Sequence, residues 1–358
     1  MILSQRENLM KLWRREGYEY VPIHFELCPA LIEKFKKRYG TCSYEDYFNF
    51  PFRYANFDFK PQNVDWTVYY PDVKFNLGTT FSAFGVAREP HPDSMHMRRM
   101  HHPMKAFTSL EQFQTYPYPA SNDSKIDSLR TLVKSIQDSG LAACGRPGAI
   151  WENAWYMRSM EELMMDMFEG NEKAVYHFNR VTDISCIQAA ILAQAGVDFM
   201  YIGDDIGMQK SIMMSEQMYR EWIKPLLTRL IKTVKDINPA ILFAYHSCGY
   251  IEPFIPDLID AGIDILNPVQ PESMSFEKIY AEYGEILSFW GTIGTQTTMP
   301  FGTPGDIGNE VNKNLRIAGT KGGLLCTPTH LLEPEVPWGN IEAYVQACRD
   351  FALCPIME

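Results

Sequence analysis

The sequence predicts an α/β fold, a (β/α)8 TIM barrel that occupies residues 1–358 as a single domain, and two observations predict it. From residue 124 onward, short apolar runs alternate with longer amphipathic stretches, which is the pattern of βαβ units around a parallel sheet. Neither GxGxxG nor GxxxxGKS/T occurs, although a doubly wound sheet usually carries such a phosphate loop after an early strand. A closed barrel therefore fits better than an open sheet, which stays the alternative.

The apolar runs give seven of the eight strands that a barrel needs. The first is residues 21–27, because this run is short and apolar and Pro29 follows it. Six more are predicted at 149–154, 199–204, 242–247, 265–269, 287–292 and 324–327. The stretches predicted to be helical are 1–20, 30–39, 160–168, 172–195, 215–236, 255–261, 276–283, 304–318 and 341–353. An eighth strand is expected within the irregular segment that precedes residue 124.

Residues 44–121 lack sustained periodicity and are crowded with aromatic residues, proline, histidine and methionine. We expect an irregular insertion that covers the mouth of the barrel. It contains His96, His101 and His102 around a pair of arginines. Because these cations repel a metal ion, we expect the histidine cluster to be a lid or solvent-facing segment rather than a second metal site.

The composition excludes several classes of protein. A formal net charge of -11 argues against a nucleic-acid partner, which requires clustered lysine and arginine. No apolar run approaches the roughly 20 residues that span a bilayer, and the first residues lack the apolar core of a signal peptide. We therefore expect a cytoplasmic protein without a membrane partner. There, the eight cysteines are reduced thiols or metal ligands rather than disulfides.

Polar side chains recur where the predicted strands end. All strands of a parallel barrel end at the same face, and the active sites of TIM barrels lie there. A stabilising core does not need carboxylates and imidazoles at that level, so these residues predict one shared pocket. They are Glu26, Glu152, Asp204, Asp205, His246, Cys248, Asn267, Gln270 and Cys326.

His246 and Cys248 are the sharpest signal in the sequence. Residues two apart on a strand project from the same face, so an imidazole and a thiolate can bind one ion together. Cys326, at the end of another apolar run, supplies a third ligand. One histidine and two cysteines with an open fourth position form a catalytic zinc site. The spacing alone supports equally well a buried histidine and two cysteines that pack as small apolar residues.

Three carboxylates at the strand ends are candidates for chemistry. Glu152 and Asp205 are predicted to be catalytic, by moving protons or by orienting substrate, because neighbouring carboxylates push their pKa values apart. Asp204 either binds substrate or caps the helix that follows its strand, and capping is equally the alternative for Asp205.

Three further residues offer contacts to a ligand. Asn267 and Gln270 either bind substrate through their amides or form a turn around the neighbouring prolines. His330 lies four residues after Cys326 and either contacts substrate at the mouth, supports a metal ligand, or makes a local hydrogen bond.

From about residue 145 to 345, the chain resembles the uroporphyrinogen decarboxylase superfamily, and most closely its cobalamin-dependent methyltransferase branch. The motifs that carry the resemblance occur in a specific order and spacing. They are ENAWYMRSMEE at 152–162, GDD at 203–205, HSCG at 246–249, GIDILNPVQ at 262–270, FWG at 289–291, GG at 322–323, and Cys326 followed by Pro328 and His330.

The resemblance implies a TIM barrel in which His246, Cys248 and Cys326 bind zinc. It also implies a corrinoid-dependent methyltransferase, which moves a methyl group between a small methylated substrate and a cobalamin that a partner corrinoid protein carries. In such a site, zinc activates the oxygen of a methyl ether or holds a thiol deprotonated. Aromatic residues in the insertion favour a methoxylated aromatic donor, and a thiol acceptor is nearly as well supported.

The chain departs from the decarboxylases of the superfamily in one respect. They carry an arginine-rich signature near the amino terminus that orients the porphyrin carboxylates, and this chain has VPIHFELCPA at residues 21–30. Porphyrin decarboxylation is therefore disfavoured. Two alternatives to methyl transfer stay open, namely a metal-independent decarboxylase and a noncatalytic scaffold that binds metal or corrinoid.

Overall fold

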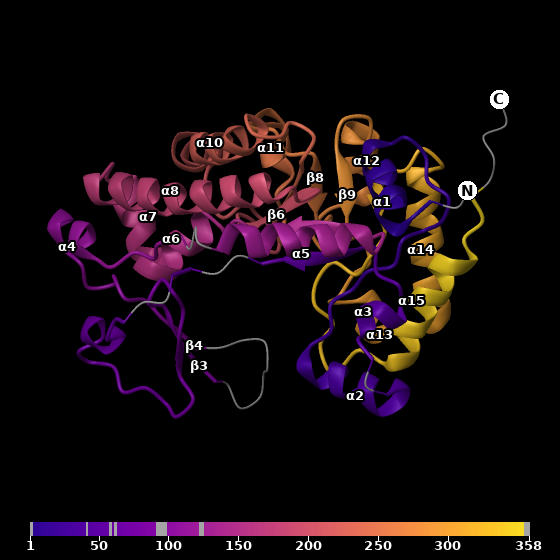
Figure 1. Cartoon of the computed structure of the whole chain (residues 1–358), viewed down its shortest axis with the longest axis horizontal. Helices are drawn as coiled ribbons and strands as arrows, with labels where there is room; N and C mark the ends of the chain where they lie inside the picture. The colour runs from indigo at the N-terminus through magenta and orange to yellow at the C-terminus, as the bar shows by residue number, and fades with distance from the viewer. Residues whose placement is uncertain are drawn as a thin grey trace.

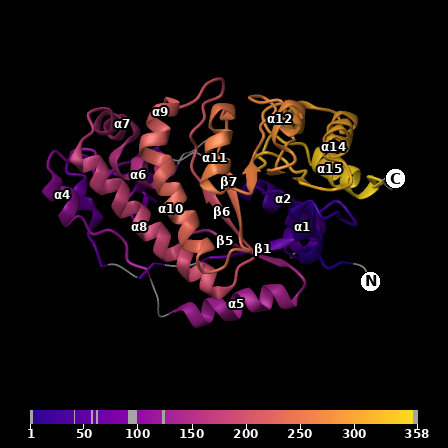
Figure 2. The same ribbon diagram turned by 90° about the horizontal axis from the view of Figure 1, so that it is seen from above.

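The computed structural model describes residues 3–40, 42–56, 59–60, 63–90, 99–121 and 125–353. Its centre is a seven-stranded parallel sheet in the order β1-β5-β6-β7-β8-β9-β10. Helices between successive strands curve around the outer face of this sheet, as the predicted TIM barrel requires (Figures 1 and 2). The strands are β1 Phe52–Ala55, β5 Ala142–Gly145, β6 Phe199–Gly203, β7 Leu242–His246, β8 Ile265–Asn267, β9 Ser288–Trp290 and β10 Leu324–Leu325.

The barrel closes through residues 21–27, the run predicted as its first strand. Leu27 forms a single parallel bridge with Leu332, in the chain after β10. On its other side, the His24 ring stacks on Phe52 of β1 with centroids 4.5 Å apart. The run therefore takes the eighth position of the barrel, with one bridge in place of a regular strand. We call this junction the barrel seam.

Two details of the strand prediction need correction. Residues 149–154 are not a strand, because helix α6 covers Trp151–Arg158 and the strand before it is β5. The β5 sequence AACG gives a weak signal, since alanine and glycine have low β propensity. The eighth strand expected before residue 124 is β1, at the start of the segment we predicted to be irregular.

Helix α8, Glu172–Ala195, has the predicted bounds because both of its ends carry strong signals. The Asn171 side chain accepts a hydrogen bond from the backbone N–H of Lys173. Gly196 ends the helix in the left-handed conformation with φ of +87°, which costs glycine little.

The predicted helix at 215–236 is divided by a π-helical turn. This turn covers Tyr219–Ile223 and lies just before Pro225, which has no N–H to continue the regular ladder.

None of the described helices is both long and apolar enough to cross a bilayer. The other helices are α1 Gln5–Arg14, α2 Pro29–Tyr39, α3 Tyr44–Tyr47, α4 Leu110–Thr115, α5 Ile126–Asp138, α7 Met160–Phe168, α9 Glu216–Met218, α10 Lys224–Lys235, α11 Ile255–Ala261, α12 Phe276–Tyr283, α13 Thr298–Phe301, α14 Pro304–Ala318 and α15 Trp338–Asp350.

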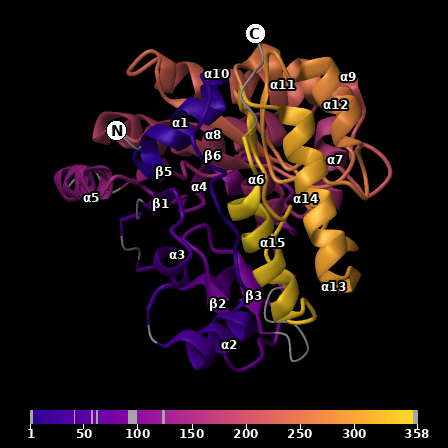
Figure 3. The same ribbon diagram turned by 90° about the vertical axis from the view of Figure 1, so that its right-hand side faces the viewer.

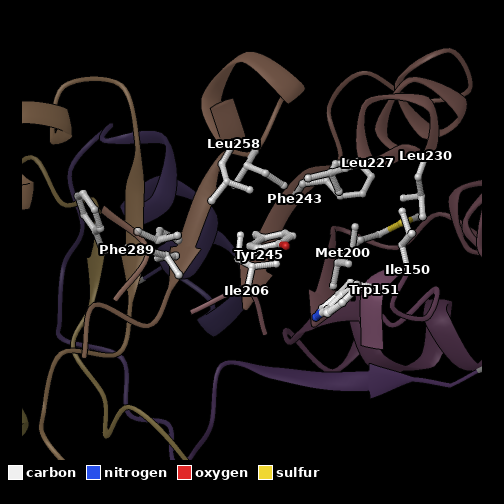
Figure 4. Close-up of a cluster of buried hydrophobic side chains, with 14 of the residues drawn as sticks. Ile150, Trp151, Met200, Ile206, Leu227, Leu230, Phe243, Tyr245, Leu258 and Phe289 are labelled. Atoms are coloured by element: carbon white, nitrogen blue, oxygen red, sulfur yellow. The ribbon is translucent and has the colours of Figure 1, made fainter. Parts of the chain in front are cut away.

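Two apolar layers lie on the two faces of the sheet. The outer layer, between strands and helices, includes Phe243 of β7 with Leu227 and Leu258 (Figure 4). The inner layer fills the barrel, where the ring centroids of Trp13 in α1 and Phe199 in β6 are 4.8 Å apart. Because side chains alternate along a strand, each position belongs to one layer or the other. The direction of each side chain therefore determines whether it can reach the candidate site described in the next subsection.

The segment 44–121 is less irregular than predicted. After β1 it forms a small antiparallel sheet of β2 Thr80–Phe81, β3 Ala87–Glu89 and β4 Arg99–His101, which we call the lid sheet. Strands β3 and β4 lie on the same side of the barrel as α2 (Figures 1 and 3). Arg88 of β3 lies over the Tyr156 ring of α6, at 5.6 Å from its centroid. The lid sheet therefore contacts the helix that begins at the mouth.

The two described histidines of this segment make polar contacts within the lid sheet and with helix α6. His101 Nε2 lies 2.8 Å from the buried carboxylate of Glu89. His102 Nδ1 lies 2.8 Å from the carbonyl oxygen of Tyr156. His96 lies outside the described residues. The two described histidines thus hold the lid sheet together and against α6.

Buried His177 makes the stability of the fold depend on pH. Tyr118 OH and His177 Nδ1 are 2.8 Å apart, and His177 Nε2 lies 2.9 Å from Ala154 O, so the neutral ring satisfies both partners. Burial lowers the pKa of His177 to about 4. Between that value and the usual 6.5, the unfolded chain binds more protons than the folded one. This residue therefore lowers the free energy of unfolding as pH falls through this window.

We expect His177→Gln to lose stability at pH 7.5, by about 1–3 kcal/mol, because the amide fits the two partners less well. The gap between the variant and the parent should shrink at pH 5, since only the parent carries the penalty of about 1.4 kcal/mol per pH unit. Denaturant unfolding of both proteins at the two pH values measures this difference. A difference in unfolding free energy that does not change with pH would show that His177 does not cause the pH dependence of stability.

Candidate metal centre

Strand β7 and the turn after it present His246 and Cys248 together. His246 Nε2 and Cys248 Sγ are 3.6 Å apart, as their spacing predicted. The turn needs Gly249, which has φ of +83° and whose Cβ, if present, would lie 2.6 Å from Met208 O. His330 is the third member of the group. One candidate ligand atom from each of the three residues lies within 4.8 Å of the others, and all three side chains are half-buried.

Asn267 fixes the orientation of the His246 ring. Its amide nitrogen donates to Trp290 O at 2.6 Å, so its oxygen faces His246 Nδ1 at 2.6 Å. Nδ1 therefore carries a proton, and Nε2 is the nitrogen that faces Cys248 and is free to bind a metal once it loses its own proton. We predicted Asn267 as a substrate contact, and the structure places it behind a candidate ligand.

The side chains around His246 favour a positive charge on its ring. Burial lowers the pKa of His246, but the hydrogen bond and charge of Cys248, the charge of Asp205 and the bond to Asn267 outweigh burial. The resulting pKa is about 10. The same attraction favours a metal cation at this position, where it would replace the proton. Two imidazoles and one thiolate are a donor set that suits zinc.

Cys326 does not reach this group. Its neighbour Leu325 belongs to the inner layer, so strand alternation turns Cys326 toward the outer layer. There the side chain is fully buried, and its Sγ lies 3.7 Å from the hydroxyl of Thr292. Burial raises the pKa of this thiol to about 12, which opposes the thiolate that a zinc ligand needs. The predicted ligand set of His246, Cys248 and Cys326 is thus not assembled, and His330 stands beside the other two.

Asp205 and Gln270 hold the turn that carries Cys248. Asp205 Oδ1 accepts a hydrogen bond from Cys248 N at 2.7 Å and lies 3.7 Å from His246 Nε2. Gln270 Oε1 accepts from Gly249 N at 2.9 Å. Both side chains therefore use their oxygens on the protein backbone. The contact of Asp205 with His246 also places one carboxylate at the edge of the candidate centre.

Asp204 and Glu152 differ in their surroundings. Asp204 is fully buried and accepts from Ile150 N at 3.1 Å and Glu152 N at 2.9 Å. It therefore caps the start of α6, which precedes its own strand β6, rather than the helix after that strand that the sequence interpretation offered. Glu152 accepts from Tyr156 OH at 2.6 Å. Burial and the charge of Asp205 raise the pKa of Glu152. Glu152 therefore keeps its proton to higher pH than an exposed glutamate.

Two cavities meet at the three candidate ligands and share Thr329, His330 and Leu331. The inner cavity, of about 90 Å³, lies on the His246 side. The outer cavity, of about 590 Å³, lies on the Cys248 side and is formed by loops after β6 to β10. The centre therefore separates a small chamber from a wide one.

Aromatic rings form much of the inner cavity, and the sequence analysis missed them. Tyr54, Tyr201 and Trp290 come from three different strands, so no local motif connects them. Tyr54 OH donates to the Glu26 carboxylate at 3.0 Å. Arg146 lies 3.7 Å from the centroid of the Tyr54 ring and 3.4 Å from Glu26, and it offsets the one carboxylate among the described residues of this cavity. The motif FWG at 289–291 was the one signal that pointed to Trp290.

A model of the uroporphyrinogen decarboxylase (URO-D) family matches residues 5–351. The chain belongs to the URO-D family. A uroporphyrinogen decarboxylase from Thermus thermophilus is 22% identical over 262 residues, which cover 71% of this chain and 72% of that protein. A methyltransferase from Methanosarcina mazei superposes with a TM-score of 0.67 at 16% identity, over 97% of this chain and 98% of that one. At this identity, the likeness confirms the TIM barrel alone.

In this member of the URO-D family, Asn267 should control metal affinity although it is not a ligand. We expect Asn267→Ala to weaken zinc binding about 10- to 100-fold, because His246 loses the acceptor that fixes its ring. Competition with a chromophoric chelator measures the affinity. Asn314→Ala is a matched control, since buried Asn314 donates to Thr292 O away from the three ligands. Equal losses in both variants would assign the effect to general loosening of the barrel.

Proposed function

We propose that the chain is a zinc-dependent methyltransferase, which moves a methyl group between a small methylated substrate, either a methyl ether or a thiol, and a corrinoid carried by a partner protein. The observation that carries this proposal is the group of two imidazoles and one thiolate at the barrel mouth, with a cavity on each side. Membership of the URO-D family and the fold shared with the Methanosarcina mazei methyltransferase support it.

In this proposal, His246, Cys248 and His330 hold the zinc ion, and a fourth position is open to substrate. His330 takes the place that the sequence interpretation gave to Cys326. Bound zinc supplies a Lewis acid that polarises an ether oxygen or keeps a substrate thiol deprotonated. Asn267 keeps the His246 lone pair turned toward the site, and Asp205 holds the backbone of Cys248.

Glu152 is the proposed proton donor. Transfer of a methyl group from an ether leaves an alkoxide, which needs a proton. Glu152 has a raised pKa and lies near Asp205 and His246, whose charges act on it. The hydrogen bond from Tyr156 OH holds one oxygen of its carboxyl group, which leaves the other oxygen for substrate.

The inner cavity supports a compact methyl compound as the substrate. Its volume of about 90 Å³ is well below the roughly 150 Å³ of an engineered cavity that binds benzene. A methoxylated aromatic, favoured by the aromatic content of the insertion, is larger than this chamber. Aromatic rings line part of the chamber, and the Glu26 charge is offset by Arg146, so the chamber suits an uncharged methyl group.

Elemental analysis of protein purified without added metal tests the ligand set. We expect about one zinc per chain in the parent and in Cys326→Ala, and loss of zinc in His246→Ala and His330→Ala. Zinc retained in His330→Ala but lost in Cys326→Ala would restore the set inferred from the sequence. No zinc in the parent, and none taken up on addition, would overturn the methyltransferase proposal in favour of a metal-independent decarboxylase or a scaffold.

Removal of the proposed acid should change how the rate of methyl transfer from an ether depends on pH. We expect kcat to fall by about a hundredfold in Glu152→Gln. In the parent, kcat should decline as pH rises through the raised pKa of Glu152, because only the protonated carboxyl donates. Glu152→Gln should lack this decline, and Tyr156→Phe should shift its midpoint. A decline that persists in Glu152→Gln would assign it to another group.

A further inference from the structure

The outer cavity is framed by residues that suit a protein partner. Phe301 of α13 is 79% exposed and Met208, in the loop after β6, is 53% exposed. Both side chains line the outer cavity and expose apolar surface that a partner could cover. Aromatic residues and methionine are also enriched in the cores of protein interfaces.

Polar side chains around this apolar rim have a definite charge. Glu333 and Glu335 line the outer cavity, and none of its described lining residues is a lysine or an arginine. Gln209 and Gln296, joined by a hydrogen bond of 3.2 Å, add two neutral amides. The net charge of -11 gives the whole chain the same sign. A partner with a basic contact surface is therefore attracted to the mouth.

The two cavities divide the candidate centre between two reactants. The inner cavity, of about 90 Å³, holds only a compact molecule, so a bulky methyl carrier does not fit there. The outer cavity is more than six times larger, at about 590 Å³ against about 90 Å³, and it includes Cys248 and His330. A large reactant therefore reaches the ligands from the Cys248 side.

We propose that Met208, Gln209, Gln296, Phe301, Glu333 and Glu335, which we call the Phe301 surface, dock the partner that carries the corrinoid. The partner presents lysine or arginine toward the glutamates and an apolar recess that receives Phe301. The inference rests on the proposed function and adds to it the place, the charge and the anchor residue of the docking. Docking here brings the corrinoid against the ligand group, while the methylated substrate or thiol occupies the inner chamber.

The test compares two forms of the same cofactor. Methyl transfer is measured with free methylcobalamin and with the methylated corrinoid protein of the source organism, under the same thiol acceptor. We expect Phe301→Asp to lower kcat/KM at least about tenfold with the corrinoid protein, because it removes an interface anchor. With free methylcobalamin, which enters the same cavity but forms no protein interface, the loss should be clearly smaller than with the corrinoid protein.

Two further variants separate docking from general effects. Phe168→Asp is a matched control, because Phe168 of α7 is also 79% exposed but does not line the outer cavity. It should leave both rates unchanged. Glu335→Lys should lower kcat/KM with the corrinoid protein and reduce its dependence on salt, since one attractive charge is reversed.

Each contrary result has a distinct meaning. Equal effects of Phe301→Asp and Phe168→Asp with the corrinoid protein would overturn the Phe301 surface while leaving the proposed function intact. A loss of equal size with free methylcobalamin in Phe301→Asp would place Phe301 in the reaction site instead. A parent protein that transfers methyl groups from neither form would refute the proposed function, and the docking inference with it.

Discussion

The hydrogen bond between His246 Nδ1 and Asn267 Oδ1 is the interaction on which the candidate centre depends. Asn267 also donates to Trp290 O, so one amide connects the ends of β7, β8 and β9. It settles which imidazole nitrogen has a lone pair, and therefore whether Cys248 and His330 can share a metal ion with His246. The same amide places the Trp290 backbone at the wall of the inner cavity. One side chain thus connects the candidate metal centre to the wall of the inner cavity.

The sequence predicted the architecture well where its signals were local. Helix α8 was placed correctly because Asn171 and Gly196 mark its ends, and the rhythm after residue 124 was enough to indicate a parallel barrel. Strand β5 was missed because AACG is stabilised by its neighbours rather than by its own side chains. The lid sheet was missed for the same reason, since its short strands depend on partners such as Glu89 and His101.

The site was predicted at the level of strand ends but not of side-chain direction. His246 and Cys248 were found because both lie on one face, within a single motif. Neighbouring residues of a strand point to opposite faces of the sheet, so Cys326 points either into the barrel or toward the surrounding helices. Strand β10 has only two residues, which is too short for the sequence pattern to decide between these two directions. His330 lies past the strand, where no periodicity applies. Asn267 and Gln270 lie beside the candidate centre, where they bond to His246, Gly249 and Trp290, and their role as substrate contacts stays a prediction.

The barrel seam lies beside the candidate centre. Leu27 and Leu332 provide the single bridge there, and they flank Glu26 on one side and His330 with Leu331 on the other. Strands β1 and β5 to β10 are joined to one another by ladders, whereas the run 21–27 is described against its neighbours by this bridge and by the contact of His24 with Phe52. Residues 21–27 are thus the segment of the described barrel with the least backbone support from its neighbours, and Glu26 of the inner cavity belongs to it.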